Sequence, residues 1–311
     1  MGHDRPKITV VGSSNMDLVV KASRIPAVGE TILGGDFIMV PGGKGANQAV
    51  AAARLGAEVF FVARLGRDIF ATHSLANFDN VGVNTRYVFE TDDAPSGVAL
   101  IMVDEKGNNS IVVAPGANSK LTPDDVEAAK GDIASSGALV AQLEVPIETI
   151  DFTSKLAESL GVPFVLDPAP AFELSSELLA RVSVLTPNES EAQLLTGIEV
   201  TDETSACSAC EVLLSRGVKA VILTMGERGY MLADGDGARF VASHEVEAVD
   251  STAAGDAFTG SLAVGIAQGE TLVDAAEYAN CIAALSVTKM GAQPSMPTKQ
   301  EVTSFMEKSV R

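Results

Sequence analysis

The stretch Asp250-Ser251-Thr252-Ala253-Ala254-Gly255-Asp256-Ala257-Phe258 gathers small residues at the point where a helix is expected to begin. Leu262 and Ile266 continue from Phe258 at four-residue spacing until Gly269, which predicts a helix. The start of a helix carries free backbone N–H groups and the positive end of the helix dipole. Because small side chains let a ligand touch these groups, we expect an anion-binding turn here.

Asp256 stands in the first turn of this expected helix. A lone carboxylate at that position usually caps the helix. Beside a bound phosphate it could also act as a general base, and these residues alone leave both interpretations open. The run Glu245-Val246-Glu247-Ala248-Val249 before the turn is strand-like, so we expect a strand to lead into it.

The composition indicates a protein with a large core. The chain has 311 residues, of which 46% are hydrophobic, enough for one α/β domain or two. Its formal net charge of −19 argues against nucleic acid or an anionic membrane as partner, although a small anionic ligand stays possible. No apolar run is long enough to span a membrane, and no signal segment opens the chain. Three cysteines make no disulfide framework, so we expect a soluble, cytoplasmic protein. Residues 1–6 look like a loose end.

Strands and helices alternate along most of the chain, which predicts an α/β fold: a mainly parallel central sheet with helices on both faces. Residues 8–11 form a continuous apolar run, as in a buried parallel strand. The other expected strands are 59–62, 139–141, 164–166, 182–185 and 220–224. Helices are expected from about residue 42 to Gly56 and at 147–160, 203–216 and 272–289.

Two regions have a different texture. Residues 18–40 contain short β-rich pieces between glycines, and residues 96–113 read as a hairpin around the turn Lys106-Gly107-Asn108. We expect them to form a small separate sheet, a lid of about residues 16–41 and 96–114, within one domain spanning residues 1–311.

Polar side chains follow several expected strands at the point where each strand ends. Because the carboxyl ends of parallel strands share one edge of the sheet, these side chains can converge. Singly, each is better explained as a cap of a turn or helix, but together they favour a site. They are Asn15 with Asp17, Gln142 with Glu144, Asn188 with Glu191, and Asp250 with Asp256.

The segment Gly42-Gly43-Lys44-Gly45 is not a phosphate-binding P-loop, because its glycine spacing is wrong and a glycine follows the lysine. Its glycines could bring the backbone close to a hydroxylated ligand, with Asn47 hydrogen-bonding to that ligand. A plain tight turn is an equal alternative. The segment Gly12-Ser13-Ser14-Asn15 lacks the three-glycine fingerprint of nicotinamide-binding folds.

Asn188 and Glu191 are three residues apart and share a helix face, which suits Mg²⁺ held partly through water. A capping pair is at least as good an explanation. Cys207 and Cys210 lie inside a helical pattern without a second ligand pair, so we interpret them as structural. The three histidines are scattered, which argues against a histidine-based triad.

Taken together, four motifs resemble the pfkB family of sugar kinases in its ribokinase form. The opening stretch resembles the C-terminal signature of the family, and Gly42-Gly43-Lys44-Gly45-Ala46-Asn47-Gln48-Ala49 resembles the N-terminal one. Thr186-Pro187-Asn188-Glu189-Ser190-Glu191 matches the Asn-x-x-Glu motif, and Gly291-Ala292-Gln293-Pro294-Ser295 is also similar. The resemblance runs from about Ile8 to the C-terminus and implies a three-layer ribokinase-like fold.

The resemblance implies roles for individual residues. The general base falls on Asp256, and the anion hole falls on Ala253, Ala254 and Gly255. Sugar contacts fall on Asn15, Met16, Asp17, Gly43, Lys44, Gly45, Ala46, Asn47 and Glu144. Nucleotide contacts fall on Asn188, Thr224, Met225, Gly226, Glu227, Arg228, Gly229, Gly255 and Asn280. An activating monovalent-cation site falls on Asp250, Thr252, Ser286, Lys289, Gly291 and Ser295, and Glu191 belongs to the water network of Mg²⁺.

The implied activity is ATP-dependent phosphorylation of D-ribose at its 5-hydroxyl, with Mg²⁺ and an activating K⁺. Phosphoryl transfer depends mostly on positioning the reactants and neutralising charge. The expected anion hole, Mg²⁺ and Asp256 would do both. Another sugar kinase of the family, such as a deoxyribokinase or fructokinase, or a nucleoside kinase is the alternative. A catalytically dead sugar-binding protein on the same fold is a further one, against which intact Asp256 and Gly255 argue. We also expect a homodimer joined through the lid.

Overall fold

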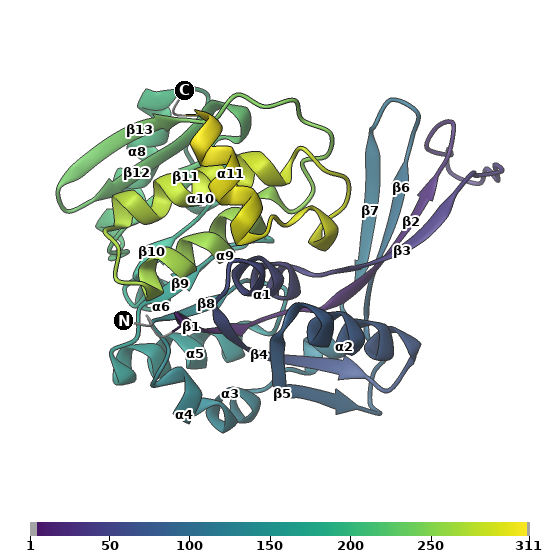
Figure 1. The fold of residues 1–311 in the computed structure, drawn as a ribbon, viewed down its shortest axis with the longest axis horizontal. Helices are drawn as coiled ribbons and strands as arrows, with labels where there is room; N and C mark the ends of the chain where they lie inside the picture. Colours follow the sequence, from purple (N-terminus) through teal and green to yellow (C-terminus); the bar gives the residue numbers. More distant parts are fainter. Residues whose placement is uncertain (1–4, 310–311) are drawn as a thin grey trace.

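The computed structural model describes residues 5–309, so residues 1–4 of the expected loose end lie outside the described part of the chain. Its centre is a nine-stranded sheet in which β12 pairs antiparallel with both β11 and β13, and the other neighbours pair in parallel (Figure 1). In spatial order the strands are β13 (Gly237–Ala242), β12 (Gly229–Asp234), β11 (Val221–Thr224), β10 (Val184–Leu185), β9 (Phe164–Leu166), β8 (Ala138–Ala141), β1 (Lys7–Val11), β4 (Glu58–Gly66) and β5 (Val83–Thr91).

Helices cover both faces of this sheet, so the expected three layers are confirmed. Alternate residues of the central strands feed two separate cores: Phe60 and Val62 of β4 point into one, whereas Val59 and Phe61 point into the other. The first core packs against α3 (Pro123–Ala128), α4 (Lys130–Ile133), α5 (Ile147–Leu160), α6 (Ser176–Leu179), α7 (Glu189–Thr196) and α8 (Glu203–Ser215). The second packs against α1 (Lys44–Arg54), α2 (Ile69–Val81), α9 (Ala254–Ala267), α10 (Leu272–Ser286) and α11 (Lys299–Ser309).

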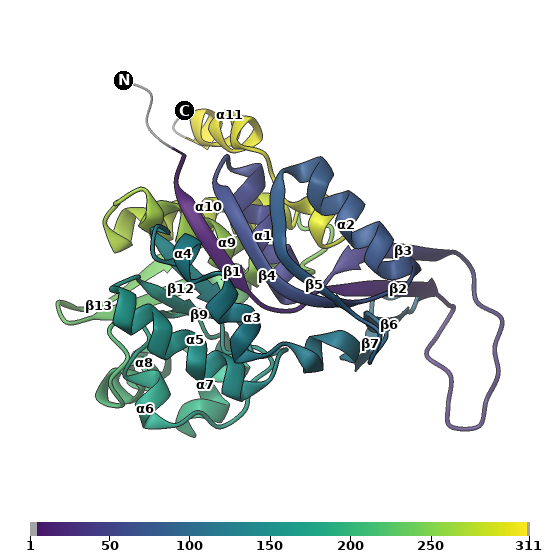
Figure 2. The ribbon, with the colours of Figure 1, turned by 90° about the horizontal axis from the view of Figure 1, so that it is seen from below.

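The expected small separate sheet is present. It has the order β3 (Phe37–Gly42), β2 (Asn15–Lys21), β6 (Gly97–Val103), β7 (Asn109–Ala114), and it projects from one side of the large sheet (Figure 1). Residues 22–36 form a long loop beyond its far end (Figure 2). Strand β2 follows β1 after three residues and α1 follows β3 after one, so the small sheet joins the large one where the polar residues lie.

The strand expected at residues 245–249 is wrong. This segment is a loop between β13, the edge strand of the sheet, and α9. The backbone N–H groups of Val249 and Asp250 instead donate to the carbonyl of Val287, at 2.7 and 3.1 Å. Two other predicted elements are too long. The strand predicted at residues 182–185 covers only Val184–Leu185, and the helix predicted at residues 272–289 ends at Ser286.

The strand order places a site at one edge of the large sheet. The chain builds outward from β1 to β4 and β5 on one side, and from β8 to β11 on the other. The crevice at such a reversal, beside the carboxyl ends of the strands, is where open α/β sheets bind ligands. Here the reversal lies between β1 and β8, next to the junction with the small sheet.

The second core predicts the effect of one substitution. Phe78 of α2 is fully buried and meets the ring of Phe61 edge-on, with centroids 5.4 Å apart. Phe78→Ala should lower the unfolding free energy by about 3–5 kcal/mol, because it removes the ring and leaves a cavity. Ile69→Ala in the same helix is the control, since Ile69 is 63% exposed. Chemical denaturation measures both, and equal losses in the two variants would contradict this view of the core.

Candidate active site

The first polar residues of the site lie where β1 ends. Ser13 donates a hydrogen bond from its hydroxyl to Oε2 of Glu144, which follows β8. The same carboxylate oxygen accepts from the backbone N–H of Lys44, the first residue of α1, at 3.2 Å. Two strand ends and one helix start are thereby tied together. Asp17 and Asp256 lie near Glu144, since the charges of Glu144 and Asp256 both act on Asp17.

Glycines make the close approach possible. A Cβ atom on residue 42 would lie 2.2 Å from a carboxylate oxygen of Asp17, so only glycine leaves room for that side chain. Gly43 has φ of +89°, and a Cβ there would lie 2.6 Å from the backbone nitrogen of Asn15. The glycines of this segment therefore serve close packing of the backbone against β2, and Lys44 opens a helix without a P-loop.

Asp256 is held by two consecutive amides of α1. Asn47 donates from Nδ2 to Oδ2 of Asp256 at 2.8 Å, and Gln48 donates from Nε2 to Oδ1 at 3.1 Å. Asp256 is only 5% exposed, so these two bonds fix the plane of a buried carboxyl group. The Oδ1 atom of Asn47 is buried and has no partner among the described residues, which leaves an acceptor available for a ligand hydroxyl.

Lys44 carries the positive charge at the centre of an acidic cluster. Burial alone would lower the pKa of Lys44, but the surrounding carboxyl groups raise it more, so the ammonium form is favoured. Those groups are Asp256, Asp167, Glu144 and Glu191. Burial, as the largest cause, raises the pKa of Asp256 as well, against the lowering effects of Lys44 and the two amides.

The turn at the start of α9 has an unusual backbone. Ala253 has φ of 60°, the one positive value at a non-glycine residue in the described part of the chain. The left-handed conformation costs about 1 kcal/mol for alanine and persists where the surroundings demand it, often at functional sites. Gly255 is exposed, with open space where a Cβ would point. An anion can thus reach Gly255, whereas the N–H group of Ala254 donates to the carbonyl of Ser251 at 3.2 Å.

A cavity of about 850 Å³ opens beside that turn, large enough for a nucleotide. Most of the expected nucleotide contacts line it: Thr224, Gly226, Glu227, Arg228, Gly229, Gly255 and Asn280. Two do not, because Met225 is buried in the core and the side chain of Asn188 caps α7. Asn280 donates from Nδ2 to the carbonyl of Ala242 at 2.9 Å, which anchors the end of β13 to α10.

Sequence reasoning missed a large part of the cavity wall. His244, Glu245 and Val246 line it from the loop after β13, in which residues 245–249 were expected to form a strand. Ala283 and Ala284 line it from α10, and Val287 lines it from the position just after this helix. With Asn280 these three follow the spacing i, i+3, i+4, i+7, so the face of α10 carrying them could have been identified from Asn280 alone.

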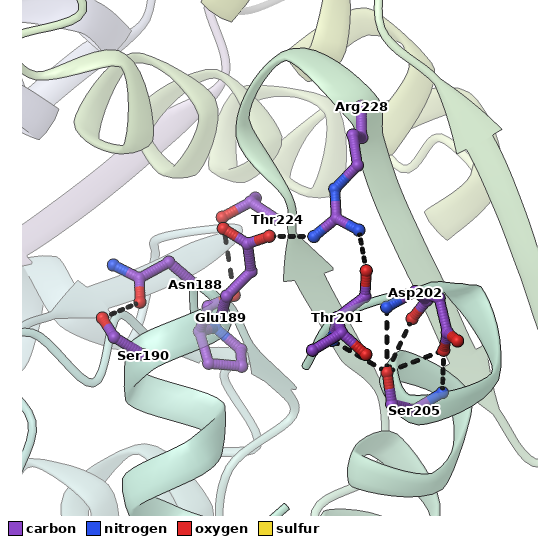
Figure 3. A network of polar contacts seen from close by, with 9 residues as sticks. Asn188, Glu189, Ser190, Thr201, Asp202, Ser205, Thr224 and Arg228 are labelled. Atoms are coloured by element: carbon purple, nitrogen blue, oxygen red, sulfur yellow. Dashed lines mark hydrogen bonds and ion pairs between the residues drawn. The ribbon is translucent and has the colours of Figure 1, made fainter. Parts of the chain in front are cut away.

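Polar contacts brace the turn between β11 and β12. Arg228 pairs with Glu189 of α7 and donates to the carbonyl of Thr201 at 2.7 Å, so its guanidinium spans from the turn to two neighbouring segments (Figure 3). Asn188 and Glu191 form a complete capping box, in which both carboxylate oxygens of Glu191 accept from Asn188, at 2.8 and 2.9 Å. The contacts therefore match the capping interpretation of this pair.

Asp250 lies apart from the acidic cluster. Its Oδ1 accepts from the backbone N–H of Thr252 at 2.9 Å, and its Oδ2 accepts from the N–H of Gly291 at 2.8 Å. Burial raises the pKa of Asp250, but the hydrogen bonds from the hydroxyl of Thr252 and from these two N–H groups lower it more, so the pKa lies below its ordinary value. Of the other residues expected around a cation, Ser286 and Ser295 bond to backbone carbonyls, and Lys289 pairs with Glu301. Among residues 5–309 no group of three or more His, Cys, Asp or Glu side chains is suited to a metal ion.

Cys210 is buried and Cys207 half-buried within α8, as expected for structural cysteines. In the described part of the chain, no helix combines the length and the apolar character needed to cross a membrane.

Comparison with known proteins agrees with this architecture. The family described as pfkB family carbohydrate kinase matches residues 5–299. A ribokinase of Haemophilus influenzae is 40% identical over 303 residues, which are 97% of this chain and 99% of that protein. A deoxyribokinase of Salmonella typhi is 37% identical over 300 residues, which are 96% of this chain and 98% of that protein.

A solved structure of Arabidopsis thaliana ribokinase complexed with ribose and ATP is similar throughout. It matches with a TM-score of 0.90 at 32% identity, over 97% of this chain and 99% of that one. The expected three-layer fold with a small second sheet is thereby confirmed.

The acidic cluster predicts a pH-dependent stability. Burial first, then Glu144 and Asp256, raise the pKa of Asp17 from 3.8 to about 7. The unfolded chain therefore releases this proton at lower pH than the folded protein, and stability is lost as the pH rises between these two values. Asp17→Asn stays neutral, so its stability relative to the parent protein should increase from about pH 5 to about pH 8.

Denaturation midpoints at several pH values measure this difference. Asp36→Asn, at an exposed aspartate just before β3, is the matched control. A constant difference between Asp17→Asn and the parent across this range would contradict the raised pKa.

Proposed function

The chain belongs to the pfkB family of carbohydrate kinases, and from this premise we propose that it transfers the terminal phosphoryl group of ATP to the 5-hydroxyl of D-ribose. One observation supports the proposal most. The buried carboxylate Asp256 lies on the anion-binding turn at the start of α9, between the nucleotide-sized cavity and the polar groups of β2 and α1.

The chemistry follows from this placement. The 5-hydroxyl oxygen attacks the terminal phosphorus of ATP, the bond from that phosphorus to ADP breaks, and Asp256 accepts the hydroxyl proton. The N–H groups of Ala253, Ala254 and Gly255 stabilise the negative charge on the transferred phosphoryl group. Lys44 supplies a positive charge nearby, and its raised pKa keeps it protonated at neutral pH.

The sugar binds where β2, α1 and the end of β8 meet. Asp17, Asn47 and Glu144 offer carboxylate and amide groups to its hydroxyls, and the unpartnered Oδ1 of Asn47 is an acceptor that a hydroxyl would satisfy. The backbone of Gly43, Gly45 and Ala46, at the start of α1, would contact it as well. Asn15, Met16 and Lys44 complete the set of proposed sugar contacts.

The nucleotide occupies the cavity lined by residues 224–229 and Asn280. Bound Mg²⁺ would neutralise the phosphates of ATP, and Glu191 suits an outer position, because Asn188 already occupies both of its oxygens. A monovalent cation suits the segment around Asp250, whose carboxylate accepts from the N–H groups of Thr252 and Gly291 and so ties these two segments together. The carboxylate and nearby backbone carbonyls would supply the hard oxygen donors that such a cation prefers.

The alternative is another sugar or nucleoside kinase of the family. The deoxyribokinase relative is nearly as similar as the ribokinase, so identity alone does not choose the sugar. Asp17 and Asn47 favour a sugar with neighbouring hydroxyls, because each polar group left without a hydroxyl partner in a dry site costs binding energy. This favours ribose.

The small sheet acts as a lid over the sugar. The chain is one kinase domain, and we place it in the cytoplasm.

Large apolar side chains are exposed on both outer strands of the small sheet: Phe37, Ile38, Met39, Ile111, Val112 and Val113. Such open, apolar edges are usually covered by pairing. A homodimer joined lid to lid would cover them.

Asp256→Asn should fold normally and lose phosphoryl transfer to ribose by a factor of about 10²–10⁴, because an amide cannot accept the proton. Initial rates with ATP and ribose, together with a circular dichroism spectrum, measure this. Asp274→Asn, at an exposed aspartate of α10, is the control. Turnover near the parent rate in folded Asp256→Asn protein would remove Asp256 from its proposed role.

Turnover should depend on a monovalent cation, with K⁺ preferred over Na⁺. A cation bound by Asp250 and nearby carbonyls would fix the N–H groups of residues 253–255, so we expect the main effect on kcat. The cation can have this effect only if it binds the ordered conformation of the turn more tightly than the disordered one. Rates in K⁺, Na⁺ or Cs⁺ at matched ionic strength test this. Equal rates in all three salts, and without any of them, would exclude the cation site.

Val112→Asp should convert the proposed dimer to a monomer, because it places a charge on the apolar lid surface, where Val112 is 64% exposed. Ile69→Asp is the control, since Ile69 is as exposed but lies outside the small sheet. Sedimentation at micromolar concentration measures both. A fully active parent protein that sediments as a monomer would refute the dimer.

A further inference from the structure

Gln48 joins two buried carboxyl groups. Its Nε2 donates to Oδ2 of Asp167 at 2.8 Å and to Oδ1 of Asp256 at 3.1 Å. Its Oε1 accepts from Nε2 of Gln142 at 2.6 Å. Gln48 is fully buried, and the two aspartates are 6% and 5% exposed. One amide group thus serves two acids that are both shielded from water.

Asp167 has no part in the reaction described above. It follows β9 at the same sheet edge as the site, and no motif in the sequence marks it. A buried carboxyl group that merely fills space would be costly, because its ionised form must be desolvated. Its link to Asp256 through a shared amide therefore calls for an explanation.

The two carboxyl groups differ in what stabilises their charge. Asp256 accepts hydrogen bonds from two amides, Asn47 and Gln48, whereas the carboxyl group of Asp167 accepts one, from Gln48. Hydrogen bonds to a carboxylate favour its ionised form. Two neighbouring buried acids do not both ionise cheaply, so the hydrogen bonds favour the charge on Asp256 and the proton on Asp167.

We propose that Asp167 keeps a proton at neutral pH and, through Gln48, holds Asp256 ionised and correctly oriented, so that the pair carries a single negative charge. Asp167 and Gln48 are then positioning residues for the base. The proposal rests on the function proposed above only in taking Asp256 as that base.

The electrostatics of the surroundings agree. Burial raises the pKa of Asp167 well above its ordinary value, and Asp256 and Glu191 raise it further against the lowering effect of Lys44. The charged groups facing the pair are Lys44 from α1, Glu144 after β8, Glu191 from α7 and Asp17 from β2. If Asp167 ionised as well, its charge would raise the pKa of Asp256 and weaken the ionised form that the reaction needs.

Infrared spectroscopy tests the proton directly. Asp167→Asn has the shape of the protonated acid, so we expect it to fold. The parent spectrum minus that of Asp167→Asn at neutral pH should contain the carbonyl stretch of a protonated carboxylic acid. The same difference for Asp92→Asn, at an aspartate whose side chain is 74% exposed, should contain carboxylate bands instead. A carboxylate band in the Asp167 difference, or failure of Asp167→Asn to fold, would overturn the proposal.

Gln48→Met tests the link between the two acids. It removes both N–H donors at similar volume, and we expect kcat to fall roughly 10- to 100-fold while KM for both substrates changes little. Losing a hydrogen bond to the ionised form raises the pKa of Asp256. The acid limb of kcat/KM should therefore move up by about one to two pH units. If the acid limb of the kcat/KM profile has the same apparent pKa in Gln48→Met as in the parent protein, Gln48 does not have the proposed role.

The two measurements separate this proposal from the function on which it rests. The infrared difference needs no turnover, so it decides the protonation of Asp167 even if Asp256→Asn retains activity.

Discussion

The site depends on one electrostatic constraint: a single ammonium group, that of Lys44, faces four carboxyl groups in a place with little water. Charges removed from water are costly unless they are paired and hydrogen-bonded, so each of these groups needs a fixed partner. Glu144 accepts from Ser13 and from the start of α1, and Asp256 accepts from Asn47 and Gln48. These bonds join the end of β1, the residues after β8, α1 and α9 into one rigid unit.

The fold meets this constraint through strand order and glycine. Because the sheet reverses its order between β1 and β8, the residues after both strands open into one crevice. Gly42 and Gly43 let the backbone of the small sheet approach Asp17 and Asn15 without clashes. The start of α9 then brings an anion-binding turn and Asp256 to the same crevice, so a phosphate donor and a polyhydroxylated acceptor can meet there.

Much of this was predictable from the sequence, and the failures have physical causes. Continuous apolar runs such as residues 8–11 identified the buried strands, and the signatures around Asp256 and Asn47 identified the site. Residues 245–249 alternate polar and apolar side chains as a strand does, but they do not pair with β13, and the N–H groups of Val249 and Asp250 donate to the carbonyl of Val287. Gln48 and Asp167 had no recognisable spacing, because their relation exists only after α1 and the end of β9 pack together.

In this crevice the terminal phosphoryl group of ATP is transferred to a pentose. The most direct measurement is the rate of ADP formation with ribose, 2-deoxyribose, fructose and adenosine as acceptors, with the position of the phosphate in each product determined by NMR. We expect the highest kcat/KM with ribose and a product phosphorylated at the 5-hydroxyl. A preference for fructose or adenosine, or no transfer to any of these acceptors, would contradict it.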